Sequence, residues 1–264
     1  MKINTNLYPN GKKYALTMSY DDGRDYDRRV VEIFDKNGIK GTFHLNSSRF
    51  DSPGAVTTPE IPDLYKNHEV SCHTLTHPFL QHCPVNVALD EIRKDRELLE
   101  KACGYTVRGM SYPFGTYNEQ VIDIMRMSGM NYSRTTIATN NFNLPSEFLA
   151  WHPTTHHKGD LKGLYERLIA SRHSTMQLLY IWGHSYEFEN DNNWNVLEDF
   201  CKLASGNDDI WYATNIEIFD YVMAIKALQF GVNYDMVYNP SCCSVWVAID
   251  GVPVEIKPGE NKLV

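Results

Sequence analysis

Short apolar segments alternate with amphipathic segments along most of this chain, and this alternation limits the folds that it can adopt. Residues 14–20 and 39–45 read as buried strands. Residues 27–36, between them, have helical apolar spacing and are followed by Asn37-Gly38, a common helix stop. A strand, a helix and a second strand in this order are typical of a parallel sheet covered by helices.

The same alternation continues to about residue 228. Further strands are expected at residues 69–72, 107–112, 175–182 and 210–213, and further helices at 63–67, 86–102, 118–127, 161–172, 194–204 and 216–228. Residues 133–153 are irregular and rich in asparagine, which predicts a loop that lines a site. About seven strand–helix units result, so we expect an α/β fold, a distorted or incomplete (β/α)7-type barrel. An open doubly wound sheet is the second choice.

The chain changes character after residue 230. Residues 236–238, 245–249 and 254–256 read as short strands separated by the turn pairs Asn239-Pro240 and Asp250-Gly251. We therefore predict a barrel domain over residues 1–230 and a small β-hairpin extension over residues 231–264 that packs on it. A chain of 264 residues, 42% of them hydrophobic, is long enough to bury one large core.

Charge and composition exclude several classes of partner. The net charge of −8 argues against nucleic acid or an anionic membrane, because no basic stripe is available to neutralise phosphates. No apolar run approaches the length of a membrane span, and the first residues lack the apolar core of a signal peptide. The six cysteines have no disulfide-framework spacing. Free thiols and a cytoplasmic location are therefore expected, and nothing in the sequence indicates an oligomeric state.

Residues suited to metal binding and proton transfer follow several predicted strands. Asp21 and Asp22 end the first strand, His73 and His184 follow later strands, and residues 111–115 follow another. Functional side chains of β/α barrels lie at the carboxyl ends of the strands. We therefore expect these residues to share one site.

His73 and His77 are four residues apart, so on a helical turn both imidazoles would share one face. This spacing alone is weak, since two surface histidines can have it by chance. With one carboxylate they form a metal site that leaves positions open for water and substrate. Zn²⁺ is favoured by ligand type, and Co²⁺, Ni²⁺ and Fe²⁺ tolerate the same ligands. The other carboxylate would act as general base, and His184 would protonate the leaving group.

These motifs resemble those of the polysaccharide deacetylases with the NodB homology domain, carbohydrate esterase family 4. The first family motif, Thr-Phe-Asp-Asp-Gly, corresponds to Ser-Tyr-Asp-Asp-Gly at residues 19–23. The second, His-Ser/Thr-x-x-His, is matched in full at residues 73–77. The resemblance covers about residues 13–228 and implies that Asp21 is the catalytic base. It also implies that Asp22, His73 and His77 bind the metal.

The third family motif, Arg-x-Pro-Phe/Tyr-Gly, is incomplete because Ser111 stands in place of the arginine. In the family that arginine holds the catalytic aspartate. Arg108 is the nearest substitute, although strand alternation alone would aim it at the opposite face. By the resemblance, the backbone N–H of Phe114 stabilises the oxyanion. Tyr112, within the same motif, is a candidate for substrate contact.

The last motifs also depart from the family. The fifth, Leu-x-His, appears as Trp182-Gly183-His184, and the tryptophan alters the pocket for the acetyl methyl group. The fourth is not recognisable, and Trp151 is the candidate aromatic wall in its place. His44, near the end of a strand, lines the pocket or packs in the core. His156 and His157 stand at no useful ligand spacing, which favours solvent-facing loop positions.

The sequence thus predicts a metal-dependent hydrolase that removes an acetyl group from an N-acetylated or O-acetylated carbohydrate. Because two motifs are altered, a hydrolase of the same fold acting on a non-acetyl or non-sugar amide remains open. A non-catalytic carbohydrate-binding relative is a third hypothesis, which the intact Asp21 disfavours. Two histidines and a carboxylate also make the site of non-haem iron oxygenases, but those enzymes usually need a β-rich barrel.

Overall fold

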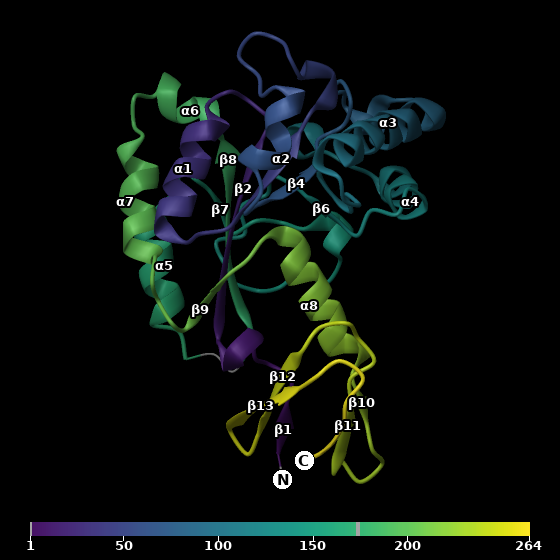
Figure 1. Ribbon diagram of the computed structural model, residues 1–264, viewed down its shortest axis with the longest axis vertical. Coiled ribbons are helices and arrows are strands. Elements are labelled where there is room, and N and C mark those ends of the chain that lie inside the picture. Colours follow the sequence, from purple (N-terminus) through teal and green to yellow (C-terminus); the bar gives the residue numbers. More distant parts are fainter. Residues whose placement is uncertain (1, 173–174) are drawn as a thin grey trace.

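The computed structural model describes residues 2–172 and 175–264. Its main sheet is entirely parallel, with strand order β6-β5-β4-β3-β2-β8-β7 and with β9 paired to the start of β2 (Figure 1). The strands are β2 (Tyr14–Asp21), β3 (Gly41–Leu45), β4 (Glu69–Cys72), β5 (Gly109–Ser111), β6 (Tyr132–Arg134), β7 (Thr155–His156), β8 (Gln177–His184) and β9 (Ile210–Tyr212). Residues of β2 are buried throughout, as expected for a central strand covered on both faces.

The segment before β7 brings the two ends of this sheet together. The Trp151 N–H donates to the Ser133 carbonyl at 2.9 Å, and the Trp151 carbonyl accepts from the Thr135 N–H at 2.9 Å. The edge strand β6 is therefore paired with chain that continues into β7. The predicted distorted (β/α) barrel is confirmed.

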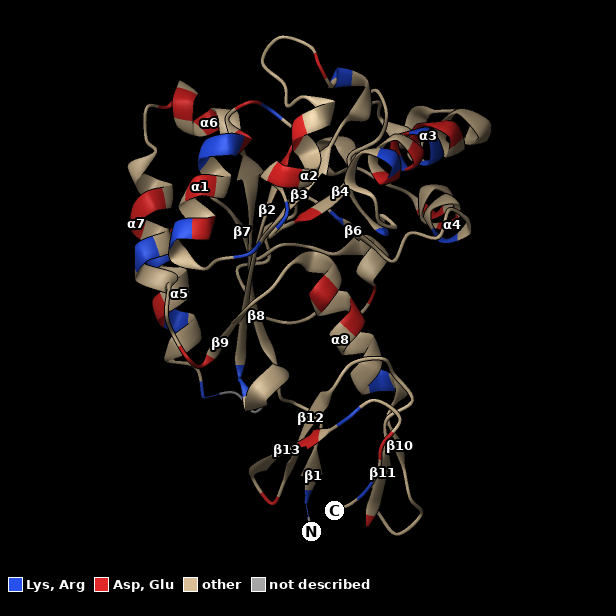
Figure 2. Ribbon diagram, viewed as in Figure 1, with Lys and Arg blue, Asp and Glu red and all other residues tan. Residues whose placement is uncertain are grey.

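Helices cover the outside of the barrel: α1 (Asp27–Asn37), α2 (Ile61–Leu64), α3 (Val85–Cys103), α4 (Glu119–Met127), α5 (Leu161–Ile169), α6 (Ser185–Asn190), α7 (Asn195–Ala204) and α8 (Asn215–Ala227). Gly38 and Gly104 end α1 and α3 in the left-handed conformation. Figure 2 shows that acidic and basic residues are interspersed along α1, α3 and α7. No helix within the described ranges is both long and apolar enough to cross a membrane.

The loop predicted over residues 133–153 is partly wrong, because it begins with the end of β6. This strand has only three residues, Tyr-Ser-Arg, and all three are buried. Ser133 and Arg134 are polar, so the apolar periodicity that reveals a buried strand is missing here. The short strand β7 and the six-residue helix α6 were also not predicted, because both are too short to show apolar periodicity.

Two small antiparallel sheets lie beyond the end of α8, away from most of the barrel (Figure 1). One joins β1 (Ile3–Asn4), β12 (Val245–Ile249) and β13 (Val252–Ile256), and the other joins β10 (Gln229–Phe230), β11 (Met236–Tyr238) and β14 (Asn261–Leu263). Tyr221 of α8 anchors the first sheet, since its hydroxyl donates to the Leu7 carbonyl at 2.9 Å and accepts from the Trp246 N–H at 3.1 Å. Both chain ends therefore contribute to this β-appendage.

Candidate active site

The paired carboxylates at the end of β2 both face the site. Extended backbone would send adjacent side chains to opposite faces, but Asp22 has φ 80° and turns the chain. The His73 Nε2 consequently lies 3.8 Å from Asp21 Oδ2 and 3.7 Å from Asp22 Oδ1.

His73 and His77 come together through a loop, so the expected helical turn is wrong. Thr74 and His77 adopt left-handed φ values of 68° and 63°, which fold the loop after β4 back on itself. The two imidazole rings are 4.7 Å apart, and His77 Nε2 lies 3.9 Å from Asp22 Oδ1. The ligand atoms of Asp22, His73 and His77 all lie within 4.8 Å of one another.

The chemistry of these three side chains fits a divalent cation. Asp22 Oδ1 is buried and has no hydrogen-bond partner within the described residues. His73 Nδ1 is 2.9 Å from the Ser111 carbonyl and 2.7 Å from Ser111 Oγ, which assigns its proton to Nδ1 and leaves the Nε2 lone pair facing Asp22. A metal ion would supply the partner that both atoms lack.

Ser111, in the position of the family arginine, links the two halves of the site. Its hydroxyl contacts His73 Nδ1 and donates to Asp21 Oδ1 at 3.1 Å. Ser111→Ala should weaken Zn²⁺ binding about tenfold, the lower end of the usual cost of an outer-shell partner, because the Ser111 carbonyl still accepts from His73. Competition with a chromophoric chelator would measure this. Ser71→Ala, which removes a buried serine bonded to Tyr132, is the matched control and should leave the affinity unchanged.

The arginine missing from the third motif is supplied by the neighbouring strand. Arg134 of β6 is in register with Ser111 of β5, and its guanidinium donates a very short hydrogen bond to Asp21 Oδ2. Its other terminal nitrogen donates to the Thr135 carbonyl at 3.0 Å, and its Cζ lies 4.3 Å from the Trp182 ring centroid. Arg134 is fully buried. The carboxylate of Asp21 is thus held by Ser111 and Arg134, which are neighbours on the adjacent strands β5 and β6.

Arg108, the substitute predicted from the sequence, is elsewhere. It makes a two-pronged ion pair with Asp220 of α8 at 2.8 and 2.7 Å. The prediction that Arg108 replaces the family arginine is wrong, and strand alternation explains why its side chain leaves on the other face.

Electrostatics keep Asp21 ionised. Burial by itself would raise the pKa of this carboxyl, but the positive charge of Arg134, followed by the imidazole of His73, lowers the pKa well below its usual range. Asp21 therefore carries a negative charge at neutral pH.

His184 ends β8 in register with Asp21. Its Nδ1 lies 3.1 Å from Glu187 Oε2, a carboxylate of α6 that the sequence analysis missed. Burial opposes the charged ring, but the hydrogen bond to Glu187 and the charge of Asp21 outweigh it and raise the pKa of His184. Glu187 could have been found from the sequence, because it lies three residues after the predicted strand end, which is the spacing of a helix capping box.

Phe114 stands beside the ligand pair. Its φ of 58° is left-handed, and no acceptor within the described residues bonds its backbone N–H. Its ring, 49% exposed, lies 4.6 Å from that of His77 and stacks at 3.7 Å on Phe79, another residue the sequence analysis missed. The site therefore has an aromatic wall made of Phe114 and Phe79.

Three residues predicted to contact substrate are buried in the core instead. Tyr112 donates to the Leu149 carbonyl at 2.7 Å. Trp151 packs edge-on against Tyr132 and Tyr180, and His44 is fully enclosed, which lowers its pKa to about 3. Trp182 is only 8% exposed, and its ring packs against the guanidinium of Arg134. Aromatic residues near strand ends look the same in sequence whether they line a site or fill a core.

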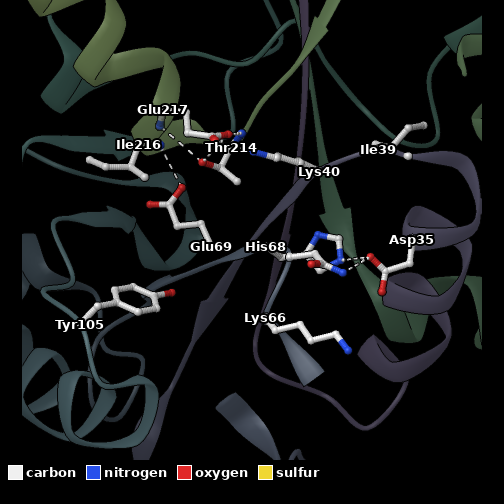
Figure 3. A pocket seen from close by; sticks show the side chains of 12 residues that line it. Asp35, Ile39, Lys40, Lys66, His68, Glu69, Tyr105, Thr214, Ile216 and Glu217 are labelled. Carbon is white, nitrogen blue, oxygen red and sulfur yellow. Dashed lines mark hydrogen bonds and ion pairs between the residues drawn. The ribbon is translucent and has the colours of Figure 1, made fainter. Parts of the chain in front are cut away.

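A pocket of about 600 Å³ lies away from these residues. Figure 3 shows Glu69 and His68, at the start of β4, with Tyr105, Lys40 and Glu217 around them. Glu69 accepts hydrogen bonds from Tyr132, Thr42 and the Ile216 N–H. Burial nevertheless raises the pKa of this carboxyl to about 7.

This raised pKa should make stability depend on pH. The folded protein holds the Glu69 proton up to about pH 7, whereas the unfolded chain releases it near the ordinary value of 4.5. Stability should therefore fall as pH rises through this window, by at most about 1.4 kcal/mol per pH unit for one proton. Glu69→Gln should make the slope measured by urea unfolding between pH 5 and 7 shallower by up to this amount, while Asp27 and Asp95, whose pKa burial also raises to about 7, keep their contributions to it. Glu97→Gln, at an exposed glutamate of α3, should keep it; equal slopes in all three proteins would contradict the assignment.

The chain was compared with known proteins. The family model for polysaccharide deacetylase matches residues 8–133. The peptidoglycan-N-acetylglucosamine deacetylase PgdA of Listeria monocytogenes is 28% identical over 128 residues, which are 47% of this chain and 26% of the relative. A chitin deacetylase of Arthroderma benhamiae is 30% identical over 114 residues, 42% of this chain and 30% of the relative. The chain thus spans less than a third of the length of these curated relatives.

Solved structures share the fold. A Mycobacterium smegmatis protein described as a polysaccharide deacetylase superposes with a TM-score of 0.62 at 15% identity, over 83% of this chain and 93% of that one. A family 4 carbohydrate esterase of Streptomyces lividans gives 0.52 at 14% identity, over 75% and 91%. A family 4 pseudoenzyme of Bacillus anthracis gives 0.50 at 19% identity, over 80% and 66%. The family model over residues 8–133 and the curated relatives, together with the shared fold, support a polysaccharide deacetylase family for this chain.

Proposed function

We propose that this chain is a metal-dependent hydrolase that removes an acetyl group from an N-acetylated or O-acetylated carbohydrate. The observation that carries the proposal is the buried carboxyl of Asp21, paired with Arg134, beside but separate from the group of Asp22, His73 and His77. A protein that only binds sugar has no need of a buried charge fixed by Arg134 and Ser111. Two curated relatives are named as deacetylases of peptidoglycan N-acetylglucosamine and of chitin, and these names favour an N-acetylated sugar as the substrate.

Asp22, His73 and His77 would hold the ion, Zn²⁺ by ligand type with Co²⁺, Ni²⁺ or Fe²⁺ as alternatives. When bound, such an ion polarises the acyl carbonyl and lowers the pKa of water. Asp21 would accept the proton of the attacking water, because Arg134 and Ser111 hold its carboxylate ionised and in one orientation.

The other side chains have separate tasks. His184 would donate a proton to the leaving nitrogen or oxygen from Nε2, because its Nδ1 is engaged by Glu187. Glu187 is a positioning residue in this scheme, because it contacts His184 and not the substrate. The free N–H of Phe114 would stabilise the charge that develops on the acyl oxygen.

The test is acetate release from acetylated chito-oligosaccharides and from acetylated xylan. Activity should disappear after treatment with a chelator and return when Zn²⁺ or Co²⁺ is added. Release of another acid, or of ammonia, from a non-acetyl amide would replace this proposal by a different hydrolase of the same fold. A protein that binds metal and hydrolyses neither class would be a non-catalytic relative, comparable with the pseudoenzyme of the same fold.

A further inference from the structure

A second group of metal-ligating side chains lies where β7 and β8 end. His156 Nε2 is 3.1 Å and His157 Nε2 is 3.3 Å from the same atom, Glu187 Oε2. These three ligand atoms lie within 4.8 Å of one another, as do those of Asp22, His73 and His77. We propose that His156, His157 and Glu187 form a second divalent-cation site, distinct from the one used in the proposed reaction.

The two imidazoles are held in place by packing. His157 is 2% exposed, stacks on Tyr20 at 5.8 Å and lies 4.2 Å from the Phe188 ring. Its approach requires Gly183, because a Cβ at that position would lie 2.0 Å from His157 Nδ1. The His156 ring lies 4.6 Å from that of Trp182. The expectation that both histidines face solvent is therefore wrong for His157, and little rearrangement is needed to bind an ion.

The distances match a metal site. With bonds of about 2.0–2.1 Å, the ligand atoms of a tetrahedral Zn²⁺ are roughly 3.3–3.4 Å apart. The two nitrogen–oxygen distances at Glu187 Oε2 are close to this value. They also match hydrogen bonds, so distance alone does not separate an ion from two imidazole protons.

The crowding around one oxygen favours the ion. Glu187 Oε2 also has the His184 Nδ1 at 3.1 Å and the His184 N–H at 3.2 Å, so four nitrogens surround it. One carboxylate oxygen offers about two lone pairs. A cation bound by His156 and His157 through their lone pairs would leave Oε2 with fewer protons to accept. His184 would remain hydrogen-bonded outside the ligand set.

The local charges permit such an ion. Burial, together with the neighbouring His156, lowers the pKa of His157 to about 3, so this ring is neutral and can donate a lone pair. Lys158 Nζ pairs with the other oxygen of Glu187, Oε1, at 3.1 Å and not with Oε2. This ammonium competes with a cation for Glu187, but it is 46% exposed and also pairs with Asp191 at 2.7 Å, which can retain it.

The test is the number of Zn²⁺ ions bound per chain, measured by equilibrium dialysis and elemental analysis of the purified protein. The wild type should bind two. His156→Ala and, independently, Glu187→Gln should each bind one, and so should His77→Ala, which removes a ligand of the other site. The double variant of His156 and His77 should bind none. His82→Ala, at an exposed histidine outside both groups, should still bind two. Near-ultraviolet circular dichroism checks that each variant is folded.

The outcomes separate this inference from the proposed function. A single ion that is lost in His77→Ala and kept in both His156→Ala and Glu187→Gln would overturn the second site and leave the proposed function standing. A single ion that is lost in His156→Ala and kept in His77→Ala would support the second site and remove the metal from the proposed reaction.

Discussion

Arg134→Met is expected to destabilise the fold by about 3–5 kcal/mol, because it leaves the Asp21 carboxylate buried without its partner. The side chains of this pair are 0% and 3% exposed, so water cannot replace the guanidinium. The loss of the positive charge should also raise the pKa of Asp21, since Arg134 is the largest influence that lowers it. Urea unfolding near neutral pH measures the change in the free energy of unfolding.

Arg108→Met is the matched control. Arg108 and Asp220 also form a two-pronged pair, but their side chains are 35% and 44% exposed. Such pairs usually contribute less than about 1 kcal/mol. If both substitutions cost the same, or if Arg108→Met costs more, Arg134 is not the residue that holds the Asp21 carboxylate.

Asp21→Asn is expected to lower kcat/KM by about 10²–10⁴-fold, the usual contribution of a general base. The amide keeps the size of the side chain and an oxygen for the Ser111 hydroxyl, but it cannot accept a proton from water. Bound metal should be retained, because Asp21 is not one of the three grouped ligands. The assay is acetate release, with metal content determined in parallel.

A double variant separates catalysis from folding. Asp21→Asn alone leaves Arg134 buried without a countercharge, so it should also lose stability. Combining it with Arg134→Met removes both charges and should recover part of that stability without recovering activity. An Asp21→Asn protein that keeps more than about a tenth of the wild-type rate would exclude Asp21 as the base.

The barrel and the grouping of most candidate ligands were predictable because each depends on local sequence pattern. Long buried strands such as β2 and β8 and the amphipathic helix α3 are readable from apolar periodicity. Parallel strands bring their carboxyl ends together, so Asp22 and His73 could be placed at one site before any coordinates existed.

The predictions that were wrong or missing concern contacts between strands or unusual backbone conformations. Arg134 replaces the family arginine only because β6 is in register with β5, and a three-residue polar strand has no periodicity to reveal it. The left-handed backbone of Asp22, Thr74 and His77 brings the candidate ligands together, and neither helix nor strand spacing predicts this conformation. Glu187 of α6 and His157, the residue directly after β7, come together although they are about thirty residues apart in the sequence.

Arg134 also connects the proposed base, Asp21, to the place where β6 pairs with the segment before β7 and closes the barrel. β6 presents this arginine to Asp21 and, through Ser133 and Thr135, pairs with Trp151, where the sheet returns on itself. Slippage of that pairing by a single residue would turn the guanidinium away from the carboxylate. Insertions between residues 136 and 150 are therefore compatible with this chemistry only if they bulge outward and leave both flanking pairings in register.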